Sequence, residues 1–132
     1  MKKQAASAVE ERELAGEVPL GATIRVMGGF FEGLELPIDR DWVVVGRGRT
    51  ADVVVAEPTI SRAHAAIGFD GVGFFVEDLG STNGTSVNGK REGPVTGGRR
   101  APRVMLNTGD EIQLGKLLLK VTLPPESGAE GF

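Results

Sequence analysis

Side chains suited to binding an anion occur in four predicted turn segments, which span residues 46–47, 59–64, 81–89 and 109–115. Arg47 offers a planar fork of N–H donors that matches the oxygens of a phosphate group. Ser61 and Thr82 carry short hydroxyl groups that can donate to the same anion, and the amide of Asn83 can both donate to and accept from an extended peptide. The set provides positive charge and donors without a paired nucleophile and base. It therefore predicts a binding site rather than a reaction site.

Ser61 and His64 raise the alternative of catalysis, because a serine near a histidine can act as a nucleophile with its base. No carboxylate is evidently placed to orient His64, and spacing alone does not make a triad. We therefore predict that His64, the only histidine of the chain, has a structural role and hydrogen-bonds a loop. Turn-forming roles for Thr82 and Asn83 are compatible with ligand binding, and an ordinary exposed arginine is the alternative for Arg47.

A glycine-rich turn at residues 46–51 has the form G-x-G-x-x-A, which is also found in dinucleotide-binding folds. That function requires a helix after the turn, because the pyrophosphate binds at the helix N-terminus. Three valines and then Pro58 follow instead, a pattern typical of a strand that ends in a turn. We therefore reject the nucleotide-binding interpretation.

The order of these segments resembles the forkhead-associated (FHA) domain family over residues 23–123. The matching motifs are Gly46-Arg47, Ser61-x-x-His64, Glu77-Asp78-Leu79-Gly80 followed by Ser81-Thr82-Asn83-Gly84-Thr85, Asn88-Gly89, and Gly109-Asp110-x-Ile112-x-Leu114-Gly115. Each motif is weak alone, but the ordered set is highly specific. The resemblance implies an eleven-stranded β-sandwich in which loops at one end bind phosphothreonine.

The resemblance also implies a role for each matching residue. Arg47 grips the phosphate, Ser61 donates to it, and Arg62 and Thr82 support it, while Asn83 holds the backbone of the peptide. Residues that keep the loops in shape are Gly46, His64 and Gly84. Thr59 lies where family members often read the residue three positions after the phosphothreonine.

The elements expected to position these side chains are short strands. Apolar, β-branched or aromatic runs occur at 23–27, 33–36, 42–46, 53–55, 63–69, 72–78, 85–87, 103–106, 111–115 and 116–123. Turn pairs such as Asn83-Gly84 and Asn88-Gly89 separate them. No convincing helix of about ten residues, a common helix length, occurs within 23–123. Independently of the resemblance, this pattern favours an all-β sandwich or barrel.

Composition agrees with one domain and excludes several kinds of site. The chain has 132 residues with 20 glycines, no cysteine and one histidine, which excludes disulfides, zinc fingers and multi-histidine metal sites. We expect no metal and no cofactor. We divide the chain into a flexible N-terminal tail (1–22), the FHA-like domain (23–123) and a flexible C-terminal tail (124–132). Residues 90–103, which are rich in arginine, are expected to form a long basic surface loop.

The sequence thus predicts a noncatalytic phosphothreonine-peptide-binding adaptor in Ser/Thr kinase signalling. Its partner would be a threonine-phosphorylated protein, either a Ser/Thr kinase or its substrate. The absence of a signal peptide, of membrane spans and of cysteine is consistent with a cytoplasmic location. The first alternative is a phospho-independent scaffold or secretion-apparatus component with the same fold. Nucleic-acid binding through residues 90–103 is a weaker alternative, because the formal net charge of the chain is −3 and its central region is neutral.

Overall fold

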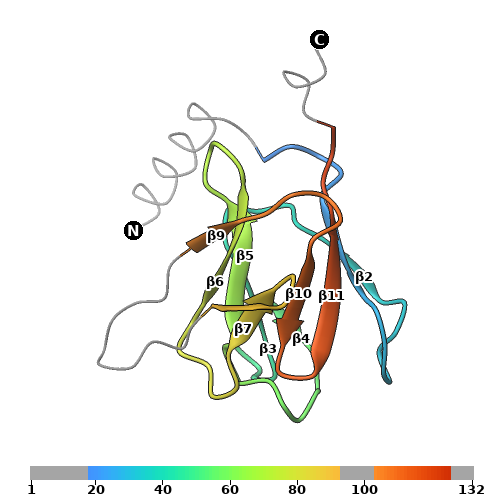
Figure 1. Ribbon diagram of the computed structural model, residues 1–132, viewed down its shortest axis with the longest axis vertical. Coiled ribbons are helices and arrows are strands. Elements are labelled where there is room, and N and C mark those ends of the chain that lie inside the picture. Colours follow the sequence, from blue (N-terminus) through green and yellow to red (C-terminus); the bar gives the residue numbers. More distant parts are fainter. Residues whose placement is uncertain (1–17, 93–102, 126–132) are drawn as a thin grey trace.

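The computed structural model describes residues 18–92 and 103–125, in which two β-sheets pack face to face (Figure 1). In order across the six-stranded sheet, the strands are β2 (Glu35–Pro37), β1 (Thr23–Val26), β11 (Leu117–Thr122), β10 (Glu111–Leu114), β7 (Thr85–Val87) and β8 (Lys90–Glu92). The five-stranded sheet contains β4 (Val53–Val54), β3 (Val43–Gly46), β5 (Ala65–Phe69), β6 (Phe74–Asp78) and β9 (Arg103–Met105). Strands β3 and β4 pair in parallel, and the other strand pairs of the described residues are antiparallel. The predicted sandwich is confirmed.

Alternating side chains build the core between the sheets. In β11, Leu117, Leu119 and Val121 are buried, whereas the residues between them are half-buried or exposed. Strand β10 repeats the pattern with Ile112 and Leu114, which are both fully buried. Successive side chains of a strand point to opposite faces, so this alternation places one face of the sheet against its partner.

The outer face of the five-stranded sheet is covered by its own side chains. The ring of Phe75 lies 6.1 Å from the ring of Trp42, and the guanidinium carbon of Arg103 lies 3.9 Å above the Phe75 ring. Arg103 also pairs with the buried Glu77 at 3.2 Å. This cover explains why all the residues of β6 are buried instead of every second one.

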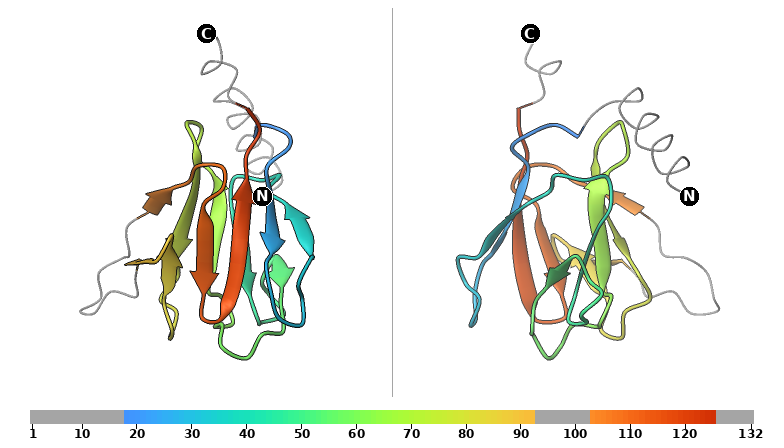
Figure 2. Two further views of the ribbon diagram at one scale, coloured as in Figure 1. Left: turned by 45° about the vertical axis from the view of Figure 1, so that its right-hand side comes forward. Right: turned by 180° about the vertical axis from the view of Figure 1, so that it is seen from behind.

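Four connections meet at one end of the sandwich, namely β3–β4, β4–β5, β6–β7 and β10–β11. In Figures 1 and 2 this is the lower end, whereas the first and last described segments, in blue and red, lie at the upper end. Hydrogen bonds confirm that the loops touch, because the Arg47 amide donates to the Ser61 carbonyl and the Thr82 amide donates to the Ser61 hydroxyl. The sandwich thereby brings together segments that are distant in the sequence.

Two predicted boundaries need correction. Residues 90–103 are not loop throughout, because Lys90–Glu92 form β8 on the edge of the six-stranded sheet and Arg103 begins β9. The intervening residues 93–102 lie outside the described part, as do 1–17 and 126–132 of the predicted tails. Within residues 18–22, Val18 packs against the core and Ala22 is buried, so the packed chain begins before Thr23.

Substitution of Gly68 tests the close contact between β5 and the segment before β3. A Cβ at Gly68 would lie 2.0 Å from the carbonyl oxygen of Asp41, whereas a Cβ at Gly28 would meet nothing within 4 Å. We expect Gly68→Ala to lower the free energy of unfolding by about 2 kcal/mol or more, because backbone must move to relieve the contact. Gly28→Ala is the matched control and should change it by less than about 1 kcal/mol. Urea unfolding of both variants measures the difference, and equal stabilities would contradict the contact.

Candidate functional site

Arg47 is positioned by a glycine that brings two backbone segments into contact. A Cβ at Gly46 would lie 1.9 Å from the carbonyl oxygen of Arg62, so the end of β3 packs directly on the β4–β5 loop. The Arg47 amide then donates to the Ser61 carbonyl at 2.9 Å, and its Nε donates to the Ile60 carbonyl at 2.9 Å. These bonds fix the side chain by its Nε. Its two terminal nitrogens have no partner among the described residues, and the side chain is exposed.

Ser61 connects the β4–β5 loop with the β6–β7 loop. Its half-buried hydroxyl oxygen accepts the Thr82 backbone N–H at 3.0 Å. The hydroxyl hydrogen has no partner in the described part of the chain, so it can be donated to a ligand. Arg47 and Ser61 thus present unpaired donors from neighbouring loops.

His64 is fully buried beneath these loops and holds both of them. Its Nδ1 accepts the Ser61 N–H at 3.0 Å, and its Nε2 lies 2.8 Å from the Gly84 carbonyl oxygen, to which it donates. This pattern requires the neutral imidazole with its hydrogen on Nε2. Burial lowers the pKa of His64, although the Gly84 carbonyl and the nearby Asp78 raise it in part.

The use of both His64 nitrogens excludes a Ser61–His64 catalytic pair in this geometry. The imidazole contacts the backbone N–H of Ser61 instead of its hydroxyl, so it cannot take the hydroxyl proton. The predicted structural role of His64 accords with these contacts. In the ranges 18–92 and 103–125, no group of three or more His, Cys, Asp or Glu residues is placed to hold a metal ion.

Asp78 shapes the β6–β7 loop, a function that we did not predict from the sequence. Its buried carboxylate accepts the backbone N–H groups of Gly80 and Ser81 at 3.0 Å each, and the hydroxyls of Ser81 and Thr85 at 2.6 Å each. The Ser81 hydroxyl in turn accepts the N–H of Gly84, whose φ of 84° suits glycine. An aspartate three residues before a serine at the end of a strand is a known turn signal and could have revealed this network.

Asn83 and Thr59 join the site to a third loop. The Asn83 Nδ2 donates to the Thr59 carbonyl at 2.7 Å, which leaves the Asn83 Oδ1 without a partner among the described residues. The Thr59 hydroxyl donates to the Glu57 carboxylate at 2.5 Å and accepts the Lys116 backbone N–H at 2.7 Å. The donated hydrogen is therefore used inside the protein, and a specificity role for Thr59 stays a prediction. The Thr59 hydroxyl and the Thr59 backbone N–H both donate to the Glu57 carboxylate, and these two hydrogen bonds lower the pKa of Glu57.

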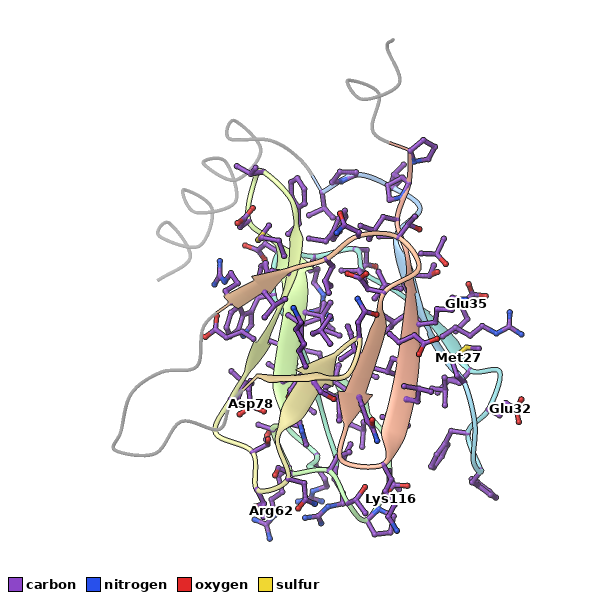
Figure 3. All side chains as sticks on the ribbon, in the orientation of Figure 1. Met27, Glu32, Glu35, Arg62, Asp78 and Lys116 are labelled. Atoms are coloured by element: carbon purple, nitrogen blue, oxygen red, sulfur yellow. The ribbon has the colours of Figure 1, made fainter. Side chains whose placement is uncertain are left out.

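Arg62 and Thr82 complete the predicted set at this end of the sandwich. Both side chains are exposed, and neither forms a side-chain hydrogen bond or ion pair within residues 18–92 and 103–125. Figure 3 shows Arg62 and Lys116 at the lower, loop end of the sandwich and Asp78 higher in the same view. The structure thus gathers all the predicted ligand residues on one rim, above the buried His64 and Asp78. We call this surface the loop rim and define it by Arg47, Ser61, Arg62, Thr82 and Asn83.

Comparison with known proteins identifies relatives of the same fold. A family model described as "FHA domain" matches residues 43–115. Glycogen accumulation regulator GarA of Mycolicibacterium smegmatis is 35% identical over 115 residues, which cover 86% of this chain and 67% of the relative. An oxoglutarate dehydrogenase inhibitor of Corynebacterium efficiens is 35% identical over 108 residues, or 80% of this chain and 68% of the relative. The chain therefore spans about two thirds of the length of these relatives.

A solved structure from work on phosphothreonine-dependent FHA domain interactions has the same fold. It superimposes with a TM-score of 0.65 at 30% sequence identity and covers 80% of this chain and 98% of its own. No helix in residues 18–92 and 103–125 is long and apolar enough to cross a membrane.

The buried neutral His64 predicts a specific dependence of stability on pH. In the unfolded chain, histidine has a pKa of about 6.5, and burial lowers the pKa in the folded protein. The unfolded state therefore binds more protons below about pH 6.5, and the free energy of unfolding falls as the pH decreases from there through the folded-state pKa. We expect this loss to be smaller in His64→Asn, which keeps an acceptor near Ser61 but cannot become charged.

Urea unfolding of both proteins between about pH 5 and 7.5 isolates the effect, because carboxyl groups contribute equally to the two curves. A difference between the two free energies that does not change with pH would show that His64 is not held in its neutral form.

Proposed function

Because this chain belongs to the FHA domain family, we propose that its loop rim binds phosphothreonine through Arg47, Ser61, Arg62 and Thr82 and the peptide backbone through Asn83. The chain is a noncatalytic, phosphothreonine-binding regulator of the kind that acts in Ser/Thr kinase signalling.

The proximity of free donors on Arg47 and Ser61 carries the assignment. A phosphothreonine has a charge of about −1.5 to −2 and three strong acceptor oxygens. The terminal nitrogens of Arg47 supply charge-assisted donors, and the Ser61 hydroxyl supplies a neutral one, without breaking the bonds that position either residue. The free donors of both side chains are therefore preorganised before a phosphate binds.

Asn83 explains why the ligand would be a peptide and not free phosphate. Its Nδ2 is used by Thr59, so its orientation is fixed and its Oδ1 can accept an N–H from a bound backbone. Arg62 adds a second exposed guanidinium to the rim. We propose that the partner is a threonine-phosphorylated protein, either a Ser/Thr kinase or one of its substrates.

A second candidate function, inhibition of a metabolic enzyme, is favoured by the relatives named oxoglutarate dehydrogenase inhibitor. We propose that this chain can bind and inhibit the same class of enzyme. Addition of the purified chain to the oxoglutarate dehydrogenase of Corynebacterium efficiens should lower its activity. Full activity at saturating concentrations of the chain would argue against this second function.

Arg47→Ala tests the phosphate contact. We expect it to weaken binding of a phosphothreonine peptide about 100-fold or more, because two charge-assisted hydrogen bonds are lost at roughly 1.5–3 kcal/mol each. Arg25→Ala is the matched control, since Arg25 is an exposed arginine of β1 that makes no contact with the loop rim. Calorimetry with a peptide selected from a phosphothreonine-oriented library measures both variants.

The unphosphorylated form of the peptide separates the proposal from its alternatives. Equal affinity for both forms would support a phospho-independent scaffold. Binding to random DNA with a steep dependence on salt would instead support a nucleic-acid-binding function.

A further inference from the structure

We propose that Thr50, in the β3–β4 loop, is a phosphorylation site of a Ser/Thr kinase. Its phosphate binds Arg47 and Arg62 from within the chain and so closes the loop rim to phosphothreonine peptides. The inference rests on the proposed function, because its effect falls on binding of the same ligand. It goes further by assigning a covalent modification that regulates the site.

Thr50 differs from most threonines of the described residues because its hydroxyl group is exposed and has no partner there. Four others use their hydroxyl groups in hydrogen bonds within the protein, namely Thr23, Thr59, Thr85 and Thr108. Thr122 is exposed, but it lies in β11 and is paired with β1. A residue within a sheet cannot enter the cleft of a kinase unless the strands separate, so Thr122 is a poor acceptor.

The backbone of Thr50 is also less restrained than that of Thr82, the other exposed threonine of these loops. The Thr82 N–H donates to the Ser61 hydroxyl, whereas neither the N–H nor the carbonyl of Thr50 forms a hydrogen bond within the described ranges. One bond, from the Ala51 N–H to the Gly48 carbonyl at 3.1 Å, closes the turn that contains Thr50. Loop segments with few backbone hydrogen bonds open at low free-energy cost, so Thr50 can reach the active site of a kinase.

Three arginines lie in or against this turn. Arg47 and Arg49 precede Thr50 in the sequence. The Gly48 N–H donates to the Arg62 carbonyl at 3.1 Å, and a Cβ at Gly48 would lie 2.9 Å from the Arg62 Cβ. The turn therefore packs directly on Arg62, and all three guanidinium groups belong to residues that neighbour Thr50 in the chain or across this contact.

These cations are available to a phosphate. The side chains of Arg49 and Arg62 and the terminal nitrogens of Arg47 form no hydrogen bond or ion pair with any residue of the described part. Asp52, the acidic residue of the same loop, already accepts a backbone N–H at 2.8 Å and lies 3.7 Å from another arginine. A phosphate on Thr50 thus meets positive charge that this carboxylate does not neutralise, and it can form about one to three charge-assisted hydrogen bonds.

The transfer step converts the Thr50 hydroxyl into a competitor of the ligand. The Thr50 oxygen attacks the γ-phosphorus of ATP held by the kinase, the bond from this phosphorus to the bridging oxygen breaks, ADP leaves, and the hydroxyl proton passes to the base of the kinase. The attached phosphate has an effective concentration at Arg47 of the order of millimolar. Its charge of about −1.5 to −2 also repels an incoming phosphate, because exposed charges interact over about 8–10 Å. Both effects lower the affinity for the peptide.

Full chains with phosphothreonine installed at position 50 during synthesis test the closure. We expect calorimetry to show that a phosphothreonine peptide binds them at least about tenfold more weakly than the unmodified chain, because the peptide must displace the internal phosphate. Phosphothreonine at position 122 is the matched control, since Thr122 is exposed and β11 ends at the opposite end of the sandwich (Figure 1). It adds the same charge and should change the affinity by less than about twofold, because salt screens charges at that separation. Thr50→Val, which adds no phosphate, should bind like the unmodified chain.

Phosphorus NMR of the installed phosphate gives an independent measure of its pairing with arginine. Guanidinium groups favour the dianion, so the second pKa of phosphothreonine at position 50 should lie below its ordinary value of about 6. Arg47→Ala should raise this pKa, because it removes one of the cations. Arg25→Ala on β1 should leave the pKa unchanged.

Accessibility is tested with a Ser/Thr kinase selected because it phosphorylates the free peptide of residues 45–55. Incubated with ATP, Mg²⁺ and the full chain, this kinase should transfer phosphate to Thr50 of the folded protein. Mass spectrometry of proteolytic fragments locates the phosphate, and Thr50→Val should remove it from this loop. Thermal unfolding confirms that every variant is folded.

Three results would overturn the inference while phosphothreonine binding by the unmodified chain stands. The first is equal peptide affinity with and without phosphate at position 50, and the second is a phosphate pKa that does not respond to Arg47→Ala. The third is a kinase that modifies the free peptide but not the folded chain. Absence of phosphate-dependent binding in the unmodified chain would instead contradict the proposed function, and with it the regulatory role of Thr50.

Discussion

A buried imidazole sets the distance between the two loops that carry the proposed ligand residues. His64 accepts from the Ser61 backbone on one side and donates to the Gly84 carbonyl on the other. Ser61 and Asn83, which is adjacent to Gly84, are therefore fixed relative to the same ring. Because the ring is fully buried and both nitrogens are used, water cannot substitute for either partner. Any ligand that must touch Ser61 and Asn83 together depends on this bridge.

The site separates polar groups into two layers. In the lower layer, Asp78 and Ser81 are buried and use their hydrogen-bonding capacity within the β6–β7 loop. In the upper layer, Arg47 and Asn83 are each held by one bond to backbone and keep further atoms free. Loops that are already ordered spare the ligand the entropy cost of ordering them, so more of the interaction energy contributes to affinity.

Local sequence patterns predicted most strands and turns. The alternation of apolar and polar residues and the Asn-Gly pairs depend only on residues that are close in the sequence. The φ values of 51° at Asn88 and 86° at Gly89 confirm the predicted hairpin turn. Strand β8 was missed because its sequence, Lys-Arg-Glu, does not alternate, although the hairpin signal implied a partner for β7. The bond between Lys116 and Thr59 joins residues 57 positions apart, and no local pattern reports such a contact. The grouping of the ligand residues came from family resemblance, which already contains this tertiary information.

The charge of the chain shows what kind of attraction the loop rim can provide. The whole chain has a formal net charge of −3, so its overall field does not attract an anion. Arg47 and Arg62 act only at short range, because mobile ions screen exposed charges over about 8–10 Å. In the proposed site, recognition must then come from donors that contact the phosphate directly, and Gly46 and His64 fix the loops that carry these donors. A site of this kind discriminates by the shape and acceptors of its ligand rather than by total charge, and this is why a nearly neutral domain can select one phosphorylated residue among many anionic surfaces.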